Sequence, residues 1–549
     1  MKHISNKIFN YKNNKQVFLN YFSKHKKIVL LCIILISYVL LYFLLDFSSQ
    51  SLVAHDEGLY ARRARLVEES FNWFSSPFEG PHHKTLGSYW LIALSIRLFG
   101  SSELALRLPS IIASFLCLFI TYFITSKIAN KHSAFISVVS LSSMPLWIQY
   151  SRYASPDILF VLCILLVILF FLKFIDTNQY NKKHFYIFLS GLFISTTFFI
   201  RSYMLFVPIL GLSPFLSFHL LRSKNVFKIT FSLGLLIGLI PTILNLYFSY
   251  RQYGIKGVTL LFDFAKDKSI GSFDFYNLLL IPINYLYLTF PIGILLIIVL
   301  SLTKSNNKIN YPLLIYIYPF ISLIILLSMS NSHIHYYLFL FPSLSMLFSI
   351  KFQSLSFRFS YSKKIISNLL FFLMVLISVA LLSSISYYKD LIIDYSYGNI
   401  FLLYLVSLLL VISFLLSLRY LFDTKYTQFN LIKFFYNIIF PQYILISLLY
   451  NFGIVGNPNS KLKYFLKDDQ VSNIISSNTI YLYNVDSKMN TLLRYYLPSA
   501  KVLKSSENIF MYDYIITSNK KVLNKYHKEF LFNPIASFDN HFLLRNIPK

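Results

Sequence analysis

Charged residues are scarce in this sequence of 549 residues, and acids are the scarcer kind. Only 13% of the residues are charged, with 22 Asp and Glu against 50 Lys and Arg. Soluble domains carry roughly 25% charged residues, so this composition excludes an ordinary soluble protein. Cysteine is almost absent: Cys32, Cys117 and Cys163 all lie inside apolar runs, which excludes a disulfide framework.

Long apolar runs take the place of the missing charge. Each has about 20 residues, the length that crosses a bilayer as a helix, and their continuous rather than alternating pattern excludes a transmembrane β-barrel. We predict an all-α polytopic membrane protein with about thirteen spans. The predicted spans are 28–47, 106–128, 133–150, 157–175, 184–200, 203–221, 227–249, 277–302, 311–330, 335–350, 365–385, 398–418 and 431–451.

Lysine and arginine gather in alternate loops between these spans. The positive-inside rule places the loops rich in Lys and Arg in the cytoplasm. We therefore predict a cytoplasmic N-terminus, with the loop 48–105 and residues 452–549 outside the cytoplasm. The same rule accounts for the net charge of +28, so the expected partner is the lipid bilayer and not nucleic acid, for which the sequence has no motif.

The loop 48–105 carries a dense group of ionisable residues beside a span, in HDEGLYARRARLVEES and PHHKTLGSYWL. Ionisable groups are costly at the membrane and indicate function. Asp56 begins a predicted interfacial helix, and SYWLIALSIRLFG predicts a second one. Capping of the first helix is the alternative to a role of Asp56 as general base or metal ligand. Glu57 adds a second carboxylate and Tyr60 lies one turn on, so both are candidate substrate-binding residues.

His83 and Lys84 complete the motif of this loop. Lys84 suits a phosphate group, and His83 suits a cation, a hydrogen-bond donor or a metal ligand. Snorkelling at the membrane interface is the alternative for both. Two adjacent histidines are weak evidence for metal binding, so a divalent metal ion is one open alternative as cofactor.

Further candidates lie in other outer loops. In YSRYASPD, Ser155 suits the cap of a helix and Asp157 lies near its positive end, while the planar fork of Arg152 suits a phosphate. Arg201 lies at a helix junction with no acid nearby in sequence, and a phosphate or a lipid headgroup would be its partner. Later segments on the same side add Lys266, Lys268, His335 and Tyr336.

Residues 452–549 have a different pattern. We predict short strands in TIYLYN, AKVLK, DYIITSN and HFLLRN, and helices in NTLLRYYL and KKVLNKYHKEF. This alternation predicts a small α/β domain. It has no glycine-rich phosphate loop and no metal-ligand spacing. We therefore expect a transmembrane domain at 1–451 and an extracytoplasmic accessory domain at 452–549.

A family resemblance rests on three stretches: HDEGLYARRARLVEES with Lys84 and SYWLIALSIRLFG, then YSRYASPDILF, then SMSNSHIHYYLFLFPSLSML. They resemble membrane glycosyltransferases that use polyprenyl-phosphate sugars, including the protein O-mannosyltransferases and the aminoarabinose–lipid A transferase. The resemblance implies the C-type glycosyltransferase architecture, with Asp56 as catalytic acid and Asp157 as the second acidic position. It also implies that Lys84 meets a donor or acceptor phosphate, and that Arg201 replaces a lysine that binds the lipid phosphate.

One departure from the family lies beside the lysine. Relatives read Glu-Lys-Pro-Pro where this chain has His83-Lys84-Thr85-Leu86. Without the glutamate, a metal site would need His83 as its replacement, and the change indicates a different acceptor.

By this resemblance we expect transfer of a sugar from an undecaprenyl-type phosphate to an envelope acceptor, with inversion, on the outer face of the inner membrane. The acceptor would be lipid A or lipopolysaccharide, another glycan, or a protein. Two other classes are open: a flippase for lipid-linked sugars, which needs charged or broken helices near the bilayer midplane, and a non-catalytic scaffold. Clustering of the ionisable groups on the outer rim favours the enzyme.

Overall fold

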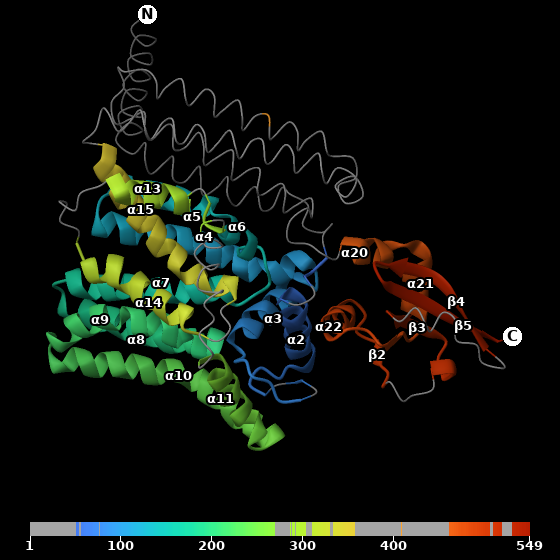
Figure 1. The fold of residues 1–549 in the computed structure, drawn as a ribbon. Coiled ribbons are helices and arrows are strands. Elements are labelled where there is room, and N and C mark those ends of the chain that lie inside the picture. The colour runs from blue at the N-terminus through green and yellow to red at the C-terminus, as the bar shows by residue number, and fades with distance from the viewer. Residues whose placement is uncertain are drawn as a thin grey trace, which may run out of the picture.

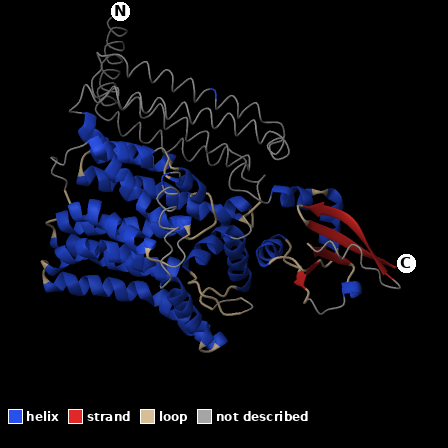
Figure 2. Ribbon diagram, in the orientation of Figure 1, coloured by secondary structure: helices blue, strands red, loops and turns tan. Residues whose placement is uncertain are grey.

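The structure is a computed structural model, and most of its described residues lie in helices (Figure 2). It describes residues 51–53, 56–75, 77–78, 80–269, 286, 288–290, 292–302, 310–329, 333–356, 408, 460–504, 509–518 and 530–548. The predicted spans 28–47, 365–385, 398–418 and 431–451 lie outside these residues, apart from residue 408. The count of about thirteen spans therefore stays a prediction.

Four helical segments in the described part of the chain are long and apolar enough to cross a membrane: Glu103–Ile128, Asp157–Asp176, Tyr180–Leu221 and Asn225–Tyr253. They contain the helices α4 (Glu103–Ile128), α7 (Asp157–Asp176), α8 (Tyr180–Arg201), α9 (Phe206–Leu221) and α10 (Asn225–Tyr253). Figure 1 shows α7, α8 and α10 side by side in one bundle. Their buried side chains belong to one apolar core.

Glycines set the closest helix contact of the bundle. A Cβ atom on Gly191 of α8 would collide with the carbonyl oxygen of Phe231, and one on Gly234 of α10 would collide with the carbonyl oxygen of Phe188. Gly238 follows Gly234 by four residues and meets the backbone of Leu192 in the same way. Small residues at this spacing let two membrane helices approach backbone to backbone.

One predicted span is interrupted, and a second break lies between two predicted spans. The segment 133–150 was predicted as one span, but it forms α5 (Lys131–Ser143) and α6 (Pro145–Tyr150). Met144 between them has an extended backbone, with ψ of 128°, because the ring of a following proline disfavours the helical conformation. A second break separates α8 from α9, where Ser202 has φ of 47° and begins the short 3-10 helix η2 (Ser202–Leu205).

Shorter elements complete the described bundle. They are α11 (Lys256–Ser269), α13 (Ile292–Leu302), the π-helix η3 (Leu313–Ile317), α14 (Tyr318–Leu327), the 3-10 helix η4 (Ile334–Leu340) and α15 (Phe341–Ser356). The two helices predicted in the first outer loop are present as α2 (Asp56–Ser70) and α3 (Gly87–Phe99).

The last described residues form three helices and a five-stranded sheet. The helices are α20 (Ser460–Lys467), α21 (Asp469–Ser477) and α22 (Ser487–Tyr496), and a short 3-10 helix η5 (Ile509–Met511) precedes β3. The strands are β1 (Tyr481–Tyr483), β2 (Lys501–Val502), β3 (Tyr514–Thr517), β4 (Phe530–Phe538) and β5 (His541–Pro548). They are ordered β2-β1-β3-β5-β4, with β1 parallel to β2 and β3, and β5 antiparallel to β3 and β4.

The four strands predicted from sequence correspond to β1, β2, β3 and β5, whereas β4 was missed. Its pattern is hidden by Pro534, where the β4–β5 register shifts; proline inside a run normally argues against a strand. Most of KKVLNKYHKEF, residues 520–529, lies outside the described residues. The division into domains 1–451 and 452–549 stays a prediction.

A second apolar core joins the last residues to the first outer loop. It contains Leu52, Ala61 and Leu86 together with Leu492 and Leu543, all fully buried. Helix α22 packs against α2, as Figure 1 shows.

Candidate functional site

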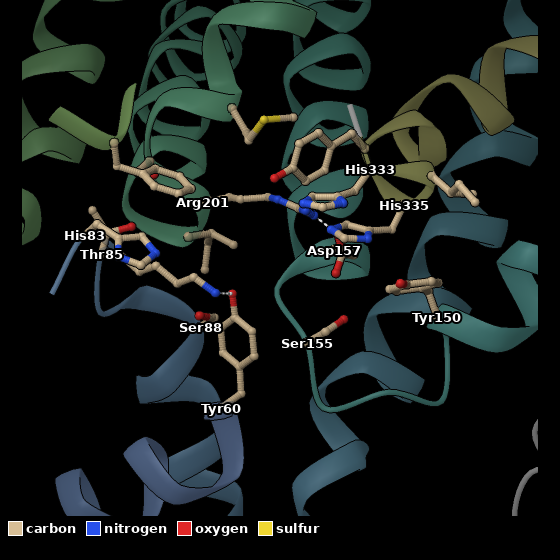
Figure 3. A pocket seen from close by; sticks show the side chains of 17 residues that line it. Tyr60, His83, Thr85, Ser88, Tyr150, Ser155, Asp157, Arg201, His333 and His335 are labelled. Atoms are coloured by element: carbon tan, nitrogen blue, oxygen red, sulfur yellow. Dashed lines mark hydrogen bonds and ion pairs between the residues drawn. The ribbon is translucent and has the colours of Figure 1, made fainter. Parts of the chain in front are cut away.

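A cavity of about 530 Å³ lies where the first outer loop meets the ends of α7 and α8. It is lined by Tyr60, His83, Lys84, Thr85, Ser88, Tyr150, Ser155, Asp157, Ile200, Arg201, Ser202, Met204, Phe264, His333, Ile334, His335 and Tyr336. Figure 3 shows Ser155 and Asp157 facing His83, Thr85 and Ser88 across the space. Segments far apart in sequence thus line one cavity with charged, polar and aromatic side chains.

Lys84 and Tyr60 form one wall of the cavity. The ammonium group of Lys84 donates to the Tyr60 hydroxyl over 3.1 Å and lies 4.7 Å from the centroid of its ring. Tyr60 in turn packs on Tyr89, with ring centroids 5.2 Å apart. A cation resting on an aromatic ring keeps its charge in a defined position, so Lys84 is ready to meet an anion in the cavity.

Arg201 and Asp157 form an ion pair across the opposite wall (Figure 3). No acidic residue lies near Arg201 in the sequence, but the fold places Asp157 of α7, 44 positions earlier in the chain, beside it. The guanidinium also lies 5.2 Å from the ring centroid of Tyr336. The adjacent Ser202 has φ of 47°, a conformation that costs energy for a residue other than glycine and is found at functional sites.

Histidines line two sides of the chamber. His83 stacks on Phe264 of α11, with ring centroids 4.2 Å apart. His335 lies against Tyr336 at 4.8 Å and Tyr150 at 5.4 Å. Within the residues that the structure describes, no group of three His, Cys, Asp or Glu side chains could hold a metal ion. A metal ion at His83 therefore stays a prediction.

His82 supports the cavity from behind. It is buried, and its Nδ1 accepts the backbone N–H of Lys84 over 3.2 Å. Burial lowers its pKa well below the ordinary value, and the charges of Arg63, His83 and Lys84 lower it further. A neutral His82 therefore orients the backbone at Lys84.

Glu57 does not line the cavity, contrary to the predicted substrate-binding role. Its carboxylate is fully buried and forms two hydrogen bonds with Arg107, of 2.8 and 2.7 Å. It also accepts the backbone N–H groups of Val53 and Ala154, each over 3.0 Å. Every strong acceptor position is used, so Glu57 ties the first loop to α4 and to the YSRYASPD segment.

Arg152 is likewise buried and is not among the residues that line either described cavity. Its predicted role at a phosphate therefore finds no support in its position. The sequence predicts that Arg152 lies at the outer end of a span, but it does not predict the direction of its side chain.

Two serine hydroxyls in the cavity wall were missed as binding groups. Ser155 was predicted as a helix cap, yet α7 has Pro156 at its N-cap and no side-chain cap. The hydroxyls of Ser155 and Ser88 are buried and have no hydrogen-bond partner in the described part of the chain. Buried polar groups are normally satisfied, so these two are available to a ligand.

A second cavity of about 500 Å³ adjoins the first and is mostly apolar. Its walls come from η2, α9, α11 and α14, and it includes the predicted Lys266. The two cavities share Ser202, Met204, Phe264 and Tyr336. The side chains of Asp56 and Lys268 lie outside the described residues; the backbone of Asp56 begins α2, as predicted.

The sequence of this chain is similar to those of several known proteins. Residues 83–248 match the family model described as dolichyl-phosphate-mannose-protein mannosyltransferase. An uncharacterized protein from Aquifex aeolicus is 25% identical over 292 residues, covering 51% of this chain and 56% of that protein. An undecaprenyl phosphate-alpha-4-amino-4-deoxy-L-arabinose arabinosyl transferase from Shewanella sediminis is 25% identical over 193 residues, covering 35% of each. The matches thus span about a third to just over half of these relatives.

The fold is similar to a solved one over nearly its whole length. The crystal structure of ArnT from Cupriavidus metallidurans bound to undecaprenyl phosphate has a TM-score of 0.70 and 14% identity, and the match covers 93% of this chain and 97% of that one. The family match and the relatives together make this chain similar to membrane glycosyltransferases that use polyprenyl-phosphate sugars.

Proposed function

We propose that this protein transfers a sugar from a polyprenyl phosphate to an acceptor of the cell envelope, on the extracytoplasmic face of the inner membrane. The observation that carries the proposal is the pair of adjoining cavities. One holds Lys84, Arg201 and Asp157, the other is mostly apolar, and they share part of their walls. A donor with a phosphate head and a long isoprenoid tail needs this combination.

The phosphate would lie in the first cavity, which the charged side chains line. Lys84 and Arg201 supply two positive charges, and Asp157 already balances the second. As the bond from phosphate to the anomeric carbon breaks, negative charge grows on the departing phosphate. Cations fixed in advance stabilise that charge more than they stabilise the ground state. The tail would follow the apolar cavity between η2, α9 and α14.

The acceptor attacks the anomeric carbon from the face opposite the phosphate, so a single displacement inverts that carbon. If the acceptor is a hydroxyl, Asp56 takes its proton as general base. If it is a phosphate, Asp56 orients it instead. Lipid A, another glycan and a protein are the candidate acceptors, and the departure at His83 indicates an acceptor other than that of the aminoarabinose enzyme.

The similarity to transferases favours an enzyme over a flippase. A transporter places its charged site near the bilayer midplane. The ionisable residues of this cavity come instead from helix ends and from the loop before α3. For orientation we propose a cytoplasmic N-terminus, with the cavity and residues 452–549 outside.

The test is substitution of Asp56 in a strain that lacks the chromosomal copy. Mass spectrometry of the lipids, polysaccharide and proteins of the deletion strain identifies the sugar that is lost. In the deletion strain, we expect the transfer activity of Asp56→Asn to be at least about 100-fold below that of the wild-type protein at equal protein level. This is the usual effect of losing a general base. Glu69→Gln, an exposed carboxylate on the same helix, is the matched control and should restore transfer. Full restoration by Asp56→Asn would refute the assignment.

A further inference from the structure

Helix α22 contacts the chain on both sides of Asp56. On the N-terminal side, the backbone N–H of Leu52 donates to the hydroxyl of Tyr496 over 2.9 Å. That hydroxyl donates in turn to Glu103 at the start of α4, over 3.1 Å. Lys463 of α20 pairs with the same carboxylate. Tyr496 therefore joins the segment before Asp56 to the end of a membrane helix.

On the C-terminal side, α22 packs directly on α2 at Gly58. A Cβ atom added to Gly58 would lie 3.2 Å from Cδ1, 3.3 Å from Cβ and 3.4 Å from Cα of Leu492. Leu492 is fully buried. The two helices are therefore close enough here, two residues after Asp56, that an added Cβ would force Leu492 to shift by a few tenths of an ångström.

Additional contacts fix the direction of α22. Arg65 of α2 donates to the carbonyl oxygen of Tyr495 over 2.9 Å and lies 5.8 Å from the centroid of its ring. The Tyr495 hydroxyl donates to the carbonyl oxygen of Ser101 over 2.8 Å. Figure 1 shows α22 beside α2, with the sheet beyond it. The helix is thus held against the first outer loop at several points rather than by one contact.

We propose that α22 is a positioning element for the transfer reaction, in which Tyr496 and Leu492 fix the path of the chain through Asp56. The inference rests on the proposed function, because it gives Asp56 a reaction to serve. Neither side chain lines the described cavities, so both act through the chain at Leu52 and Gly58, on either side of Asp56. Misplacement of a reacting group by about 1 Å lowers a rate by about 100-fold, so a shift of a few tenths of an ångström is measurable.

The first test compares two glycines of the same loop. Gly58→Ala would press on Leu492, whereas a Cβ on Gly80 meets no atom within 4 Å. We expect Gly58→Ala to lower kcat about tenfold with little change in KM for the donor, because it displaces the reacting group and not the lipid site. Gly80→Ala should keep the wild-type kcat. Combining Gly58→Ala with Leu492→Ala should recover part of the loss.

Thermal unfolding separates positioning from general damage. Alanine favours a helix over glycine by about 1 kcal/mol. This gain in the free energy of unfolding opposes the loss from the close contact with Leu492, so Gly58→Ala should lower Tm by no more than that contact alone would. A fall in kcat without a matching fall in Tm supports positioning. If kcat and Tm fall together in Gly58→Ala and recover together in the double variant with Leu492→Ala, α22 is only structural.

The second test removes one hydroxyl. Tyr496→Phe should reduce kcat several-fold while leaving KM for the donor unchanged, because Leu52 loses its anchor. Tyr481→Phe in β1, whose ring packs against that of Tyr512 with centroids 4.2 Å apart, is the control and should keep full kcat. Wild-type kcat in both Gly58→Ala and Tyr496→Phe would overturn the inference while an inactive Asp56→Asn would leave the proposed function standing. An active Asp56→Asn would instead overturn both.

Discussion

At the scale of single residues, the partner of each buried charge decides its role. Glu57 and Asp157 are both buried carboxylates, and each faces an arginine. Glu57 is enclosed by Arg107 and two backbone N–H groups, so it cannot reach a ligand. Asp157 lines the cavity with Arg201, so a ligand phosphate can share that pair. The same chemistry thus serves the fold in one place and the cavity in another.

The Glu57–Arg107 pair makes a prediction about stability. Glu57→Gln leaves the buried guanidinium without its counter-charge, and breaking a buried pair in this way costs about 3–5 kcal/mol. We expect a marked fall in Tm of the purified protein in detergent. Glu69→Gln removes only an exposed pair with Arg65, worth at most about 1 kcal/mol. Similar Tm values for the two variants would contradict a structural role of Glu57.

For the hydroxyls of Ser88 and Ser155 we predict the opposite: their loss should affect binding of the donor and not stability. Neither has a hydrogen-bond partner in the described part of the chain, so Ser155→Ala and Ser88→Ala remove no contact within the protein. We expect an unchanged or slightly higher Tm, together with a rise in KM for the donor of about tenfold, the value of one hydrogen bond to a ligand. A fall in Tm with an unchanged KM would show that the hydroxyls serve the fold.

At the scale of elements, local signals in the sequence predicted where helices begin. Asp56 and Asp157 are the first residues of α2 and α7, because acids and turn residues favour a helix start. The partners of these elements could not be predicted in that way. Arg107 meets Glu57 across 50 positions and Arg201 meets Asp157 across 44. Such pairs depend on how the helices pack, which periodicity does not encode.

The segment before α3 gives a prediction about pH. Burial lowers the pKa of His82, so the folded protein binds a proton there less readily than the unfolded chain, whose histidine has a pKa of about 6.5. Stability from this group is therefore full above that pH and falls as the pH is lowered through it. We expect Tm to fall between pH 7 and pH 5, and less steeply in His82→Gln. Parallel curves for the two proteins would contradict this account.

At the scale of the whole molecule, helix α4 runs from one end of the described bundle to the other. Glu103 begins α4 near α20 and α22, and the helix ends at Ile128. Its 26 residues span about 39 Å, more than the apolar thickness of a bilayer. The far end gathers Lys127, Lys131 and Lys173, and Lys127 pairs there with Asp176 over 2.5 Å. Loop charges in the sequence predict that this end faces the cytoplasm.

This cluster of lysines predicts which end of α4 faces the cytoplasm, and labelling can test the prediction. Lys467 of α20 and Lys131 of α5 are both exposed and lie near opposite ends of α4. By the positive-inside rule, the end with clustered lysines faces the cytoplasm. A membrane-impermeant maleimide applied to spheroplasts should therefore label Lys467→Cys and leave Lys131→Cys unlabelled until the membrane is opened. Both variants carry Cys32→Ser, and the remaining Cys117 and Cys163 are buried. Labelling of Lys131→Cys alone in intact spheroplasts would invert the topology and place the cavity in the cytoplasm.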